Sequence, residues 1–124
     1  MTQEIFLVLT MLQVKHFLFD FLLQTPYQWQ NKGVFMHPGG LLHSGLHGVG
    51  TGLIILLFFP WQTALLWAAF DSGSHYLIDY IKVNVTKRAG WRADTHPEFW
   101  YAVGFDQYCH QSVYIVILIG LFGV

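Results

Sequence analysis

The sequence predicts an all-α integral membrane protein, a four-helix bundle with up-and-down topology. Hydrophobic residues make up 54% of the 124 residues and charged residues only 10%, whereas soluble domains carry about 25% charged residues. Four apolar segments reach the roughly 20 residues that a helix needs to cross a bilayer. We therefore expect a single transmembrane domain that spans residues 1–124.

Prolines set the expected helix ends. Pro26 follows the first apolar segment, Pro60 makes a tight turn between the second and third, and Pro97 suits the first turn of the fourth. Residues 84–96 form a polar linker. The N-terminal run lacks the basic start and the cleavage site of a secretory signal, so we expect it to be retained as the first span. The expected helices cover about residues 5–23, 41–59, 61–83 and 97–122.

The basic residues predict the orientation in the membrane. Lys32, Lys87, Arg88 and Arg92 lie in the first and third loops, whereas the termini and the second loop contain no Lys or Arg. The positive-inside rule places these two charged loops in the cytoplasm and both termini outside. The net charge of −1, without a clustered basic face, argues against a nucleic-acid partner. The expected partners are membrane lipids, a second copy of the chain or a larger membrane complex.

The second segment carries a row of small residues. Ser44, Gly48 and Gly52 are four residues apart and therefore lie on one helix face. Small residues at helix interfaces in membranes allow two backbones to approach closely. We expect this face to pack against a neighbouring helix.

Each expected helix also carries a pair of potential metal ligands four residues apart, and such pairs lie on one helix face. Up-and-down topology brings all four pairs to one level, about 5 to 15 Å inside the cytoplasmic boundary. Eight such side chains are about twice what one tetrahedral zinc ion needs, so we expect two divalent ions, zinc before iron or manganese. Because Cys109 is the only cysteine, the chain can form no internal disulfide and no thiolate metal site. The predicted ligands are His16, Asp20, His43, His47, His75, Asp79, Asp106 and His110.

Three points are left open by these residues. The same pairs could form a metal-free buried polar network or a proton path. Asp71 lies one turn from His75 and is either a ligand or a hydrogen-bond partner of a ligand. Asp71, Asp79 and Asp106 are the candidate general bases, and Lys82 either serves the site or extends to the membrane interface.

Four short runs of the sequence combine into one pattern: residues 16–25 together with Lys32, residues 43–47, residues 75–82 and residues 106–110. This pattern resembles a family of small bacterial and phage-borne membrane proteins classed as domain of unknown function 3307. The resemblance covers nearly the whole chain. It implies a multi-span protein of the bacterial inner membrane and carries no established activity. The pairs of His and Asp on membrane helices are also loosely similar to the sites of membrane-bound metal-dependent hydrolases.

Metal-assisted hydrolysis is the leading functional hypothesis. Divalent ions held by His and Asp lower the pKa of bound water and polarise a phosphoryl or carbonyl oxygen. A site just beneath the cytoplasmic headgroups suits an ester, phosphoester or amide in a lipid or another membrane-borne molecule. One alternative is a di-iron oxidoreductase that hydroxylates or desaturates acyl chains. The other is a non-catalytic scaffold, or a relay for protons or ions.

Overall fold

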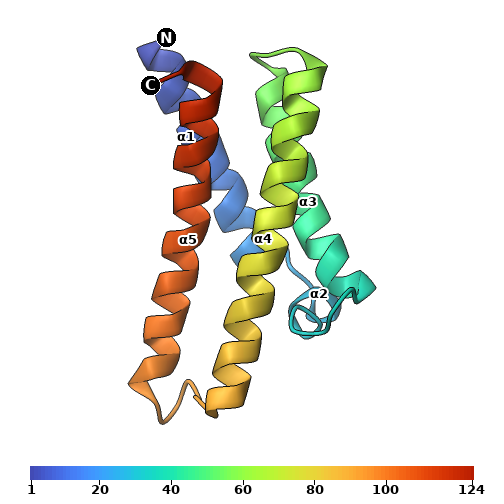
Figure 1. The fold of residues 1–124 in the computed structure, drawn as a ribbon, viewed down its shortest axis with the longest axis vertical. Coiled ribbons are helices and arrows are strands. Elements are labelled where there is room, and N and C mark those ends of the chain that lie inside the picture. Colours follow the sequence, from blue (N-terminus) through green and yellow to red (C-terminus); the bar gives the residue numbers. More distant parts are fainter.

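The protein contains helices and no β-strand in a computed structural model that describes all 124 residues. The chain contains four long helical segments. They alternate in direction, and both termini lie at the same end of the molecule (Figure 1). The all-α class predicted from the sequence is confirmed. The elements are α1 (Thr2–Phe17), the π-helix η1 (Leu18–Leu22), the short α2 (Pro26–Trp29), α3 (Pro38–Leu56), α4 (Trp61–Ala89) and α5 (Pro97–Phe122).

Two helices extend beyond their predicted ends. α3 begins at Pro38, because proline suits a first helical turn and the His37 side chain caps the helix by accepting the Gly39 N–H. α4 does not end at Val83 and continues to Gly90, whose left-handed backbone (φ 70°) terminates it. The beginning of the predicted polar linker is therefore helical. This extension places the basic end of α4 beyond the level of α2 (Figure 1).

The first helix ends in a π-helix that the sequence did not predict. In η1 the Leu23 N–H donates to the Leu18 carbonyl, five residues earlier. Such wide turns are rare and occur frequently at functional sites. Asp20 lies within this segment and is buried, with 4% of its surface exposed. The wide turn therefore presents a carboxylate to the interior of the protein.

Glycine allows α3 to approach α4 closely. A Cβ atom on Gly48 would lie 2.6 Å from the Ala68 carbonyl oxygen and 2.8 Å from the Ser72 Cβ. One on Gly52 would lie 3.1 Å from the Ala68 Cβ. Together with the buried Ser44, these glycines form the predicted small-residue face. Close packing of the two helices sets the depth of the histidines on α3 relative to His75 on α4.

A pair of alanine substitutions tests this packing. Gly48→Ala should destabilise the protein by about 1 to 3 kcal/mol, because the added methyl group collides with the α4 backbone. Gly45→Ala is the matched control, since no atom lies within 4 Å of its added Cβ and alanine favours the helix. Unfolding of both variants in a denaturing detergent measures the difference. Equal stability would contradict the close approach.

The distribution of polar residues is the reverse of that in a soluble domain. Fourteen buried residues are polar or charged and only eight are hydrophobic, whereas Phe6, Leu53, Leu65 and Phe105 are among many large apolar side chains that are more than 60% exposed. The apolar core, which includes the fully buried Val8 and Ile117, occupies the end near the termini. Polar side chains fill the interior beyond it. An apolar exterior around a polar interior is unfavourable in water.

Hydropathy supports two of the four predicted spans. Thr2–Leu22 and Pro38–Leu56 are long and apolar enough to cross a membrane. α4 and α5 are long enough, but the acidic residues, histidines and basic residues along them reduce their hydropathy. Two such helices indicate membrane association only weakly. The predicted four-span membrane bundle is therefore not confirmed.

Candidate metal centre

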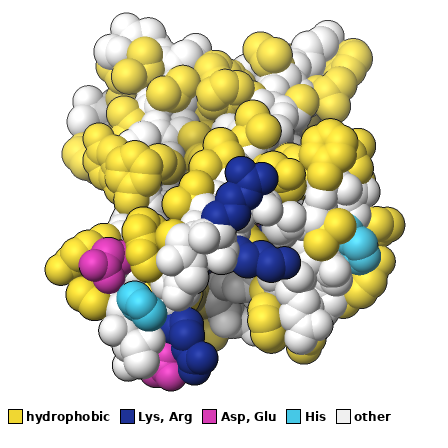
Figure 2. Space-filling view, turned by 60° about the horizontal axis from the view of Figure 1, so that its bottom comes forward, with side chains coloured by type: hydrophobic (Ala, Val, Ile, Leu, Met, Phe, Trp, Pro, Cys, Tyr) yellow, Lys and Arg dark blue, Asp and Glu magenta, His cyan; other side chains and the backbone are white.

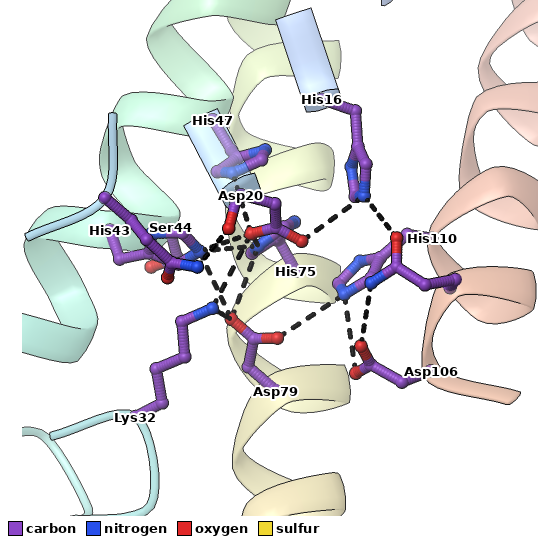
Figure 3. Close-up of polar contacts among 12 residues, drawn as sticks. His16, Asp20, Lys32, His43, Ser44, His47, His75, Asp79, Asp106 and His110 are labelled. Atoms are coloured by element: carbon purple, nitrogen blue, oxygen red, sulfur yellow. Dashed lines mark hydrogen bonds and ion pairs between the residues drawn. The ribbon is translucent and has the colours of Figure 1, made fainter. Parts of the chain in front are cut away.

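The carboxylate of Asp20 lies at the centre of the first group of ligand-type side chains. Its Oδ1 atom is 2.9 Å from His43 Nε2, 3.4 Å from His47 Nε2 and 3.5 Å from His75 Nε2. Figure 3 shows these four side chains pointing toward one another from η1, α3 and α4. All four are buried and could together hold one metal ion. We call this group the Asp20 cluster.

A second group surrounds Asp79. The Asp79 Oδ2 atom is 3.4 Å from His75 Nε2, and its Oδ1 atom is 3.4 Å from His110 Nε2 (Figure 3). His75, Asp79 and His110 could hold a metal ion, and we call them the Asp79 cluster. His75 belongs to both clusters, and His43 lies 3.4 Å from Asp79 Oδ2. The two clusters are therefore adjacent parts of one centre.

Spacing along the helices explains this convergence. His43 and His47 share one face of α3, and His75 and Asp79 share one face of α4, since each pair is four residues apart. The close packing of α3 on α4 brings both faces to one level. The structure brings together six of the eight predicted ligands: Asp20, His43, His47, His75, Asp79 and His110.

His16 and Asp106 lie at the edge of the centre and in neither cluster. The two ring nitrogens of His16 lie 2.9 Å from Gln107 Oε1 and 3.0 Å from the Tyr114 hydroxyl, and Nε2 is also 3.3 Å from Asp20 Oδ2. Asp106 accepts a hydrogen bond from the Gln107 amide, and its Oδ1 atom is 3.6 Å from His110 Nε2. These contacts make His16 and Asp106 outer partners of the clustered residues.

Lys32 also reaches the centre, although the sequence placed it only in a charged loop. Its Nζ atom lies 3.0 Å from Asp79 Oδ2 and 3.6 Å from Asp20 Oδ1. Two hydrogen bonds fasten this loop to α4: the Asn84 amide donates to the Gly33 carbonyl, and the Met36 N–H donates to the hydroxyl of a tyrosine on α4. The only signal for this role was the presence of Lys32 in the combined sequence pattern.

Asp71, expected to be either a ligand or a hydrogen-bond partner of a ligand, belongs to neither cluster. The Lys15 ammonium donates to Asp71 Oδ2 over 2.7 Å and to the Thr51 hydroxyl over 2.9 Å. The Thr51 hydroxyl in turn donates to the same carboxylate over 2.6 Å. Asp71 is paired because a buried carboxylate needs a counter-charge and hydrogen bonds. Lys15 also donates to the His47 carbonyl, so this group lies directly behind the Asp20 cluster.

The ligand atoms of the centre are suited to a cation. His47 Nε2 and His110 Nε2 are buried and have no hydrogen-bond partner. Asp20 Oδ1 and Asp79 Oδ2 are also buried, and their close contacts are ion-pair contacts to the histidines and to Lys32. Asp20 Oδ1 lies 2.9 to 3.5 Å from the three histidine nitrogens of its cluster, and ligands around a tetrahedral zinc with bonds of about 2.0 to 2.1 Å are about 3.3 Å apart. Buried groups of this kind are costly unless something satisfies them. These clusters could hold metal ions.

Comparison with known proteins yields one match. No curated protein and no solved structure matches the chain significantly. The family described as "Protein of unknown function (DUF3307)" matches residues 8–124, a range that contains every residue of the centre. The chain therefore belongs to the DUF3307 family.

Proposed function

We propose that the protein is a metal-dependent hydrolase of the bacterial inner membrane, with two divalent ions, zinc in the first instance, held by the two clusters. The observation that carries this proposal is the convergence of Asp20, Asp79 and four histidines, whose ligand atoms are buried and lie within 4.8 Å of one another in each cluster. Carboxylate and imidazole together suit zinc, iron and manganese, and neither cluster contains a cysteine.

His75 belongs to both clusters, but its Nε2 atom can bind only one ion. If His75 binds the ion of the Asp79 cluster, each cluster offers three ligands. The Asp79 cluster then keeps a position for water or substrate, as in catalytic zinc sites. A metal ion held there would supply Lewis acidity and a water of lowered pKa. Asp106 is the candidate general base, because its Oδ1 atom has no hydrogen-bond partner and lies beside His110.

The proposed protein crosses the membrane four times, with the termini outside and the basic loops in the cytoplasm. The apolar exterior and polar interior of the helices support this placement. Both termini lie at one end, and Lys and Arg side chains gather near the middle of the opposite end (Figures 1 and 2). The substrate is then a lipid or another membrane-borne ester, phosphoester or amide near the cytoplasmic face. A C-terminal fluorescent reporter that matures only in the cytoplasm should give no signal.

Metal analysis combined with an activity assay tests the proposed function. Protein purified in mild detergent without chelators should contain zinc or manganese and should hydrolyse a membrane-borne ester or phosphoester, and both properties should be lost on chelation. Iron with a visible absorption band would favour an acyl-chain oxidoreductase instead. Protein that carries no metal and takes up none would overturn the proposal.

One observation favours a second candidate, a metal-free polar network that stabilises the helices or relays protons. The Lys32 ammonium already lies between the carboxylates of Asp20 and Asp79, where it offsets part of their charge. Lys32→Met separates the two candidates. In a metal protein it removes a competing cation, so metal occupancy is kept or increased. In a metal-free network it leaves two buried carboxylates without their cation and destabilises the fold.

A further inference from the structure

An apolar groove runs between α4 and α5 beside the Asp79 cluster. Its cavity of about 310 Å³ is lined mainly by hydrophobic side chains, including Ile81, Phe105 and Cys109. Asp106 also lines it, and this carboxylate is 3.6 Å from His110. Ile81 and Phe105 are more than half exposed, so the groove opens to the outside of the helices. We call this cavity the α4/α5 groove.

A polar cavity of about 660 Å³ lies beside the groove. Gln24, Gln30, Lys32, Lys82 and Thr86 line it, together with aromatic residues at its edge. Figure 2, which turns the bottom of the molecule toward the viewer, shows Lys and Arg side chains near the middle of this face. No carboxylate lines this cavity. We call it the basic cavity.

Lys82 connects the two cavities, because it lines both of them. Its ammonium forms no ion pair and lies 5.7 Å from the centre of the Phe99 ring. Lys32, the other cation of the basic cavity, extends from there to Asp20 and Asp79. A ligand that occupied both cavities would therefore meet the free Lys82 ammonium and the carboxylate-paired Lys32 ammonium at one end, and apolar side chains at the other.

We infer that the substrate is an anionic phospholipid, with its phosphate between Lys32 and Lys82 and an acyl chain in the α4/α5 groove. This inference rests on the proposed hydrolase function and narrows its substrate class to phosphoesters. Lysine commonly binds phosphate as a point charge. A neutral ester carries no charge that the two ammonium groups could attract. The groove holds the acyl chain along the wall that carries Asp106. This position brings the phosphoester next to the Asp79 cluster.

Photocrosslinking in vesicles tests the inference without relying on activity. The full-length protein is reconstituted in phosphatidylcholine vesicles that contain a trace of phosphatidylglycerol with a photoactivatable group on one acyl chain. We expect crosslinks on α5 around Phe105 and Cys109. Unlabelled phosphatidylglycerol should compete, whereas phosphatidylcholine and chainless glycerol phosphate should not.

Two pairs of variants localise the site. Lys82→Gln should reduce crosslinking about tenfold, because it removes a charged contact to the phosphate, whereas Lys87→Gln, an exposed lysine that lines neither cavity, should not. Ala102→Phe should block the groove. Gly104→Phe places the same side chain on the same helix, where the added Cβ meets no atom within 4 Å, and should have little effect.

The outcomes separate this inference from the proposed function when metal content is measured on the same samples. Suppose that the protein binds metal, but phosphatidylcholine competes for crosslinking as well as phosphatidylglycerol does, or Lys82→Gln and Ala102→Phe leave crosslinking unchanged. Either result overturns the phospholipid inference and leaves the hydrolase proposal intact. Selective crosslinking in a protein that binds no metal overturns the hydrolase proposal and retains the lipid site.

Discussion

Asp20→Asn should weaken metal binding by more than about 100-fold, beyond the 10- to 100-fold loss that follows removal of an outer partner. Asp20 Oδ1 is the atom that three histidines approach within 3.5 Å. An amide keeps the shape of the side chain but removes the negative charge that a cation needs. Metal content after purification and titration with a chelator of known affinity measure the change.

Two variants serve as references for this result. Asp94→Asn changes the same functional group in an exposed loop, where Arg92 pairs with the carboxylate and lowers its pKa, so metal content should stay unchanged. His16→Gln removes an outer partner of Asp20 and should produce an intermediate loss, about 10- to 100-fold. If Asp20→Asn retains full metal occupancy, the Asp20 cluster is not a metal site.

Lys15→Met should destabilise the protein by about 3 to 5 kcal/mol, because it leaves the Asp71 carboxylate buried without its counter-charge. Both side chains are almost fully buried, and Lys15 Nζ lies 2.7 Å from Asp71 Oδ2. Asp71→Leu should have a similar effect, because it leaves the ammonium unpaired. Unfolding in a denaturing detergent measures both losses.

The double variant Lys15→Met/Asp71→Leu supplies the decisive comparison. Replacing both partners of a buried pair with apolar residues is frequently near neutral, so the double variant should be more stable than either single variant. Thr51 then loses an acceptor for its hydroxyl, which leaves a small residual cost. If the double variant lost as much stability as the two single variants combined, the result would contradict the pairing. Metal content should largely survive, since neither residue belongs to a cluster.

The sequence predicted much of the centre because helix periodicity is a strong constraint. His43 and His47 are four residues apart, as are His75 and Asp79, and each pair needs only a helix to share a face. Short connections between antiparallel helices then limit the relative depth of the pairs. Six of the eight predicted side chains converge for this reason. The small-residue face around Gly48 follows from the same periodicity.

The remaining features depend on contacts that periodicity does not encode. Lys32 reaches the centre only because its loop is hydrogen-bonded to α4. The π-turn around Asp20 departs from the regular helix that four-residue spacing assumes. Lys15 interrupts an apolar run, and nothing in that run identifies Asp71, 56 residues away, as its partner. Partners so far apart in the sequence can be identified only from the packing of the helices.

Anomalous diffraction from crystals of protein purified without chelators tests the central claim most directly. We predict anomalous peaks within about 2.0 to 2.2 Å of the Asp20 carboxylate and the nearby histidine nitrogens, with a second peak among His75, Asp79 and His110. Data recorded on both sides of the zinc and iron absorption edges would identify the element. A map without anomalous density in either cluster, and with the Lys32 ammonium between Asp20 and Asp79, would contradict the claim.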